Sequence, residues 1–115
     1  MRELEALAGL GSNVRLFVPS TLDIDQKAVN SSEVRMVAEL FSSWFGGATA
    51  YRALGCWSSP AVGLVSEEVT IIESFCSESA LASRISEVID FARALRDRLR
   101  QEAVVLEVDR KLYLI

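Results

Sequence analysis

The chain has 115 residues, of which 50% are hydrophobic and 24% charged, a composition typical of one soluble globular domain. Its net charge of -4 gives no support for nucleic-acid binding. It contains no histidine, which excludes the commonest general base, the usual metal ligand and any Ser-His or Cys-His nucleophile pair.

The compartment is predicted from what the sequence lacks. No apolar run approaches the roughly 20 residues of a membrane span, and the N-terminus lacks the apolar core of a signal peptide. Cys56 and Cys76 cannot form a metal site alone, and two thiols in a cytosolic chain are more often reduced than paired. We therefore expect a cytoplasmic protein with no membrane, metal or cofactor requirement; whether the cysteines pair stays open.

Residues 1–13 are predicted to form a short N-terminal extension, because helical spacing over residues 2–8 is broken by Gly9 and Gly11. A single α+β domain is expected over 14–115. It begins with a β-rich strand over 14–18, which Pro19 ends, followed by a polar connection over 19–29.

A helix is predicted from a capping box, in which Asn30 accepts from a first-turn amide and Glu33 reaches back. Its apolar face runs from Val34 to Phe45, and Gly46 is well placed to end it in a left-handed conformation.

Two strands are expected next, over 49–57 and 65–75. In the second, Glu73 shares a face with Ile71 and Phe75, while Ile72 lies on the other face. A second helix is predicted to start near Ser77, and strands over 103–108 and 112–115 close the chain. The turn between them lacks glycine, so the geometry of that hairpin is not fixed by its sequence.

The predicted fold class is α+β. The order of elements matches a ferredoxin-like βαββαβ arrangement with an additional C-terminal strand. In this arrangement two helices cover one face of an antiparallel sheet.

The stretch from Phe41 to Trp57 is rich in glycine and aromatic residues. Gly46 and Gly47 sit where a helix ends, whereas phosphate-binding loops sit where one begins. A helix end with a tight turn into a strand is therefore the favoured interpretation. The alternative is a pocket lined by this backbone, with Tyr51 or Trp57 as a wall.

Three residues are candidates for ligand binding: Tyr51, Trp57 and Glu73. The aromatic pair is most simply explained as core or interface anchors. A carboxylate on an apolar strand face must be paired, for example by Arg15 or Arg52, if helices cover that face. If the face is open, Glu73 is a solvated charge, which is the favoured interpretation.

A basic ridge near the end of the second helix is formed by Arg93, Arg96 and Arg100. We interpret it as a solvated helix end whose cations interact favourably with the helix dipole.

Several segments together resemble a family of small uncharacterised bacterial proteins. The resemblance implies a shared fold from residue 14 onward and an association with the mobile gene pool, and it implies no catalytic residue. The matching segments are Phe45-Gly-Gly-Ala-Thr49, Gly55-Cys-Trp57, Glu68-Val-Thr-Ile-Ile72, Gln101-Glu-Ala-Val104 and Leu112-Tyr-Leu-Ile115.

The favoured functional hypothesis is a non-enzymatic binding or interaction module that acts as a homo-oligomer, in which a second copy covers apolar positions such as Ile72, Val104, Leu106 and Val108. The alternative is a cofactor-free enzyme or small-molecule binder, with Glu73 as acid or base and Tyr51 or Trp57 as a wall. An inhibitor-type role toward another protein fits the acidic charge, but no residue argues for it.

Overall fold

The computed structural model describes residues 1–19 and 31–115. Two sequence predictions lie outside the described residues: the polar connection over 19–29, except for Pro19, and the capping role of Asn30. The elements, in chain order, are α1 (Arg2–Glu5), β1 (Ser12–Pro19), α2 (Ser31–Phe45), β2 (Thr49–Ser59), β3 (Gly63–Cys76), α3 (Glu78–Arg98), β4 (Val105–Val108) and β5 (Lys111–Leu114).

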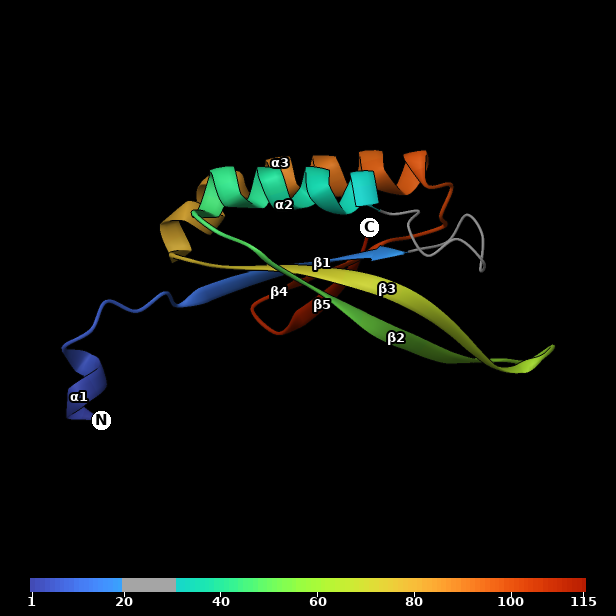
Figure 1. Ribbon diagram of the computed structural model, residues 1–115, viewed down its shortest axis with the longest axis horizontal. Helices are drawn as coiled ribbons and strands as arrows, with labels where there is room; N and C mark the ends of the chain where they lie inside the picture. The colour runs from blue at the N-terminus through green and yellow to red at the C-terminus, as the bar shows by residue number, and fades with distance from the viewer. Residues whose placement is uncertain (20–30) are drawn as a thin grey trace.

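The predicted α+β class is confirmed. The described residues form one five-stranded antiparallel sheet in the order β2-β3-β1-β4-β5. Helices α2 and α3 lie side by side on one face of it (Figure 1). The order differs from that of a simple four-stranded ferredoxin sheet, because β5 adds an edge strand next to β4.

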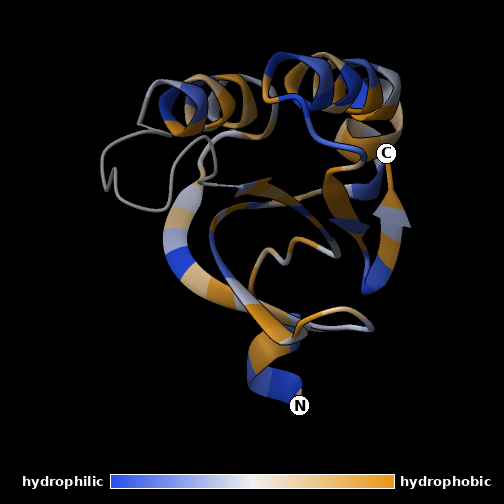
Figure 2. Cartoon of the chain, turned by 90° about the vertical axis from the view of Figure 1, so that its right-hand side faces the viewer, coloured by the Kyte–Doolittle hydropathy of each residue, from blue (hydrophilic) through white to orange (hydrophobic). Residues whose placement is uncertain are grey.

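The core lies between this sheet and the two helices. Alternation along β1 points Val14 and Leu16 toward the helices, and both are fully buried. Phe41 of α2 and Val88 of α3 meet them from the other side, also with no exposed surface. We call this the covered face of the sheet, and the opposite one the open face. Figure 2 shows the helix layer and the curved sheet end on.

The ends of both long helices follow from the sequence. Gly46 has φ of +94° and donates to the Ser42 carbonyl, which confirms the glycine stop predicted for α2. Ser77 caps α3, since its side chain accepts from the backbone N–H of Ala80 at 3.1 Å. The Gly47 carbonyl then accepts a 2.6 Å hydrogen bond from the Ser74 hydroxyl, which ties the start of β2 to β3.

The burial of several apolar side chains departs from the sequence prediction. Ile72, Leu106 and Val104 are nearly or fully buried beneath the helices, so the expectation that they need cover from a second copy is wrong. The strand register explains this, because Ile72 and Leu106 both pair with Leu16 on the covered face.

The turn between β4 and β5 has positive φ at both central residues, 49° at Asp109 and 71° at Arg110. This is the pattern of a type I′ turn, which matches the twist of the flanking strands. The sequence predicted a turn here but left its geometry open, because neither residue is the glycine that usually adopts this conformation.

The β2-β3 hairpin extends well beyond the helices, and α1 extends in the opposite direction (Figure 1). The radius of gyration of 15.7 Å therefore exceeds the roughly 13 Å of a compact chain of this length. Within the described residues, no helix has the length and apolar character needed to cross a bilayer.

Candidate functional site

A row of side chains runs across the open face, one from each strand. The register aligns Thr49, Glu73, Arg15, Glu107 and Leu112 on β2, β3, β1, β4 and β5. Directly paired residues of antiparallel strands point to the same face, so the three charged side chains at the centre of the row meet. Their positions are fixed by alternation, because their neighbours on each strand fill the core.

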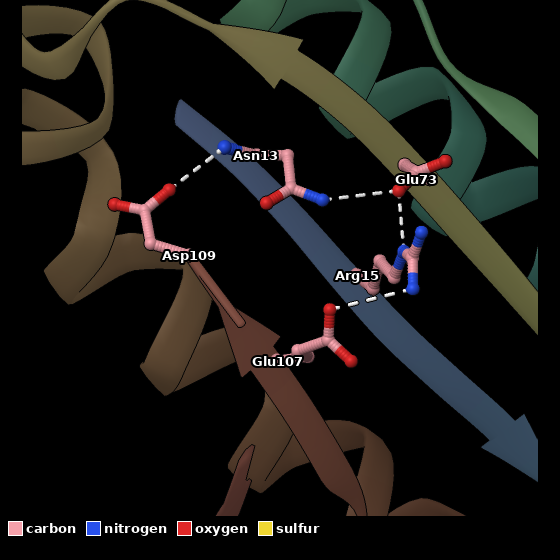
Figure 3. A network of polar contacts seen from close by, with 5 residues as sticks. All are labelled: Asn13, Arg15, Glu73, Glu107 and Asp109. Atoms are coloured by element: carbon pink, nitrogen blue, oxygen red, sulfur yellow. Dashed lines mark hydrogen bonds and ion pairs between the residues drawn. The ribbon is translucent and has the colours of Figure 1, made fainter. Parts of the chain in front are cut away.

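Arg15 is the centre of this network (Figure 3). Its Nε donates to Oε2 of Glu73, and its Nη1 lies 3.4 Å from Oε2 of Glu107. Asn13 also donates to Oε2 of Glu73, at 3.0 Å. The Glu73 side chain is only 11% exposed although no helix covers it. It is therefore a paired carboxylate on the open face, which corrects the interpretation of Glu73 as a solvated charge.

The β4-β5 turn is attached to the same network. Asp109 Oδ1 accepts from the backbone N–H of Asn13 at 2.9 Å, and its Oδ2 accepts from the Ser12 hydroxyl at 3.3 Å. The backbone N–H of Asp109 donates to the carbonyl of Asn13 at 3.1 Å. These three hydrogen bonds hold the turn against the start of β1.

A depression of about 530 Å³ opens beside the network, at the end of the open face where β1 begins. We call it the cup. Its volume lies in the range of about 300–1,000 Å³ that small-molecule sites occupy. Residues 10–12 contribute to it, and its other lining residues are Asn13, Arg15, Phe75, Glu107, Asp109 and Arg110.

The electrostatics of the network favour a permanently charged Arg15. The hydrogen bond to Glu73 raises the pKa of the Arg15 guanidinium above its ordinary value, and the electrostatic interactions with Glu73, Tyr51 and Glu107 act in the same direction. Partial burial opposes this rise in pKa but does not cancel it.

The three residues predicted from sequence do not form one site within a chain. Glu73 joins the Arg15 network, and Tyr51 lies on the same face, paired with Ile71 and close enough to influence the pKa of Arg15. Trp57 pairs with Val65, eight residues along β3 from Glu73, which is about 26 Å along a strand. Trp57 therefore lies away from the network, on the extended hairpin.

The remaining sequence features have simpler explanations. Arg93 and Arg96 of the basic ridge lie beside Asp90 and Asp97, at 3.5 and 3.0 Å. Cys56 is exposed, Cys76 is buried, and both are free. Across residues 1–19 and 31–115, no group of three or more acidic or cysteine side chains is arranged to hold a metal ion.

Sequence reasoning missed most of the network. It named Arg15 and Arg52 as alternative partners of Glu73, and the register selects Arg15, because Arg52 pairs with Thr70 on the other face. Asn13, Glu107 and Asp109 were not singled out. The available signal was Glu107, an isolated charge within an apolar strand, together with Arg15 in a similar setting.

No protein-family model matches the chain, and no curated protein is similar to it at a significant level. Two solved structures share its fold. A phage SAM lyase in complex with S-methyl-5'-thioadenosine aligns with a TM-score of 0.65 and 20% sequence identity, over 97% of this chain and 94% of the other. A phage SAM lyase in the apo state aligns with a TM-score of 0.61 and 17% identity, over 91% and 88% of the two chains.

This likeness corrects the favoured hypothesis of a non-enzymatic module, and with it the expectation that the protein is not an enzyme. The fold that nearly the whole chain shares is that of an enzyme. The finding agrees better with the alternative hypothesis, a cofactor-free enzyme or small-molecule binder.

Proposed function

We propose that the protein is an enzyme that binds S-adenosylmethionine and cleaves it as a lyase. The observation that carries the proposal is the similarity of fold, over 97% of the chain, to a phage SAM lyase in complex with S-methyl-5'-thioadenosine. The site we propose for the chemistry is the open face around Arg15 and Glu73.

The chemistry suits a chain without histidine. Cleavage between the sulfonium sulfur and the four-carbon amino-acid group gives the bonding electron pair to sulfur, so S-methyl-5'-thioadenosine leaves as a neutral thioether. No general acid is needed to protonate it. The carbon fragment is completed either when its own carboxylate oxygen bonds to the freed carbon or when the adjacent carbon loses a proton. In the second route, a carboxylate such as Glu73 is the available acceptor.

The charges of the open face favour this substrate. Glu73, Glu107 and Asp109 outnumber Arg15 and Arg110, so the region carries one negative charge in excess. S-adenosylmethionine carries one net positive charge near pH 7, because its amino and carboxylate groups balance and the sulfonium remains. Opposite charge raises the local substrate concentration and the association rate.

The test is chromatographic detection of S-methyl-5'-thioadenosine after the protein is incubated with S-adenosylmethionine. We expect release by the unaltered protein and at least a tenfold slower release by Glu73→Gln, since losing one charged contact costs about 1.4 kcal/mol or more. Glu67→Gln is the matched control, because Glu67 lies on the same strand face outside the network. Absence of release by the unaltered protein, with the fold intact, would contradict the proposal.

We also propose that the protein is a homo-oligomer with a ferredoxin-like subunit. Four large apolar side chains on the extended hairpin are half or more exposed: Leu54, Trp57, Val62 and Leu64. A second copy of the chain is the occupant we propose for them, because the hairpin projects beyond its own helices. Light scattering on a gel-filtration peak at micromolar concentration tests this; a monomer would contradict it.

Two free cysteines, one of them exposed, fit a reducing cytoplasm.

A further inference from the structure

We infer that the cup binds the zwitterionic amino-acid end of the substrate, with Arg110 receiving the carboxylate and Glu107 the ammonium group. This inference rests on the proposed function, and it assigns a part of the substrate to a defined part of the site.

Arg110 is the first observation. It lines the cup, and no hydrogen-bond or ion-pair partner for its guanidinium occurs in the described part of the chain. Its φ of 71° lies in the left-handed region, at a type I′ position where glycine is the favoured residue. An arginine therefore occupies this position at a conformational cost. A guanidinium is the group that binds a carboxylate with two parallel hydrogen bonds.

Glu107 provides the opposite charge. Its side chain is 18% exposed, and its contact with Arg15, at 3.4 Å, is at the loose end of an ion pair. Asp109 is less available, since both of its carboxylate oxygens already accept hydrogen bonds from β1. An ammonium group entering the cup thus meets Glu107 as its acceptor, while Asp109 holds the turn in place.

Phe75 supplies an apolar wall. Phe75 is 56% exposed, lies on the open face and lines the cup together with the two charged groups. An aliphatic chain packs against such a ring, and a sulfonium over its face is attracted as other cations are. A carboxylate receptor, an ammonium acceptor and an aromatic wall in one depression match the amino-acid end of S-adenosylmethionine.

The experiment compares two ligands that share the adenosine and a neutral sulfur. S-adenosylhomocysteine carries the amino-acid chain, whereas S-methyl-5'-thioadenosine carries a methyl group in its place. Calorimetry on the unaltered protein and on Arg110→Gly measures both affinities. We expect Arg110→Gly to weaken S-adenosylhomocysteine binding at least tenfold and to leave S-methyl-5'-thioadenosine binding within about twofold.

Arg100→Gly is the matched control, because Arg100 is also an arginine with positive φ, at 53°, but lies at the end of α3 outside the cup. It should leave both affinities unchanged. Glu107→Gln should reproduce the selective loss. If Arg110→Gly weakens both ligands equally or neither, the assignment of the cup is overturned and the proposed function stands. If the unaltered protein binds neither ligand nor S-adenosylmethionine, both are overturned.

Discussion

The two faces of the sheet are built from alternating residues of the same strands, yet they have opposite characters. Val14 and Leu16 on the covered face have no exposed surface, whereas Arg15 between them reaches two carboxylates on the open face. Because side chains alternate along each strand, the residues that fill the core and the residues that form the charged network lie on opposite faces of the sheet. The covered face determines the fold, and the open face is then available to hold charged groups at fixed positions.

The largest expected effect contrasts two phenylalanines. Phe41 on α2 is fully buried against the covered face, and Phe75 on β3 is 56% exposed on the open face. Phe41→Ala should lower the free energy of unfolding by about 3–5 kcal/mol, because it leaves a cavity. Phe75→Ala should lower it by less than about 1 kcal/mol. Urea unfolding followed by circular dichroism measures both; equal losses would mean that the open face is also part of the core.

The ion-pair network should contribute less stability than the core. Glu73→Gln should lower the free energy of unfolding by about 1–2 kcal/mol, because it removes a charge-assisted contact of a nearly buried carboxylate. Glu67→Gln, with no partner among the described residues, should change it by less than about 0.5 kcal/mol. Since the pKa of Arg15 is raised above its ordinary value, its charge persists in strongly alkaline solution. Equal effects of the two substitutions would contradict the network's role.

Arg100 and Arg110 both have a left-handed backbone conformation, so replacing each with glycine tests whether the strained conformation of Arg110 serves ligand binding. Arg100→Gly and Arg110→Gly should each raise the free energy of unfolding by about 0.5–1 kcal/mol, because glycine adopts positive φ without steric cost. Only the second should impair ligand binding. Thermal unfolding of both variants measures the gain. A loss of stability in Arg110→Gly would show that its side chain has a structural role in the turn.

The smallest expected effect is a loss of stability at high pH that comes from Cys76 on the covered face. Burial raises the pKa of the Cys76 thiol above its ordinary value of 9.0. A raised pKa in the folded state gives stability that is complete below pH 9 and is lost as the pH rises above it. The loss at pH 9.5 should be at most about 0.8 kcal/mol. Cys76→Ala should remove this dependence and Cys56→Ala should not, since Cys56 is exposed; the same slope in all three proteins would exclude Cys76 as its source.

Much of the fold could be predicted from the sequence because it depends on local patterns. The helical spacing up to Phe45, the stop at Gly46 and the face shared by Ile71 and Glu73 are all properties of neighbouring residues. Which face of the sheet the helices cover is not local. For that reason the expectation for Ile72 was wrong, even though the alternation in its strand was assigned correctly.

The site was less predictable for the same reason. Arg15 and Glu73 are 58 positions apart in sequence, and Asn13 and Asp109 are 96 apart. Their contacts depend on the register of three strands, which the sequence of any one strand does not specify. Trp57 shows that a shared strand face does not make residues neighbours: it lies on the same face as Tyr51 but far along the hairpin from Glu73.

The central claim is that the open face around Arg15 binds an adenosyl sulfur compound. The most direct measurement is the change in backbone amide NMR shifts when S-adenosylhomocysteine is added to the isotope-labelled protein. We predict that the largest changes fall at Asn13, Arg15, Phe75 and Glu107, with the covered face little affected. Changes confined to the tip of the β2-β3 hairpin or to α3, with none in the Arg15 network, would contradict it.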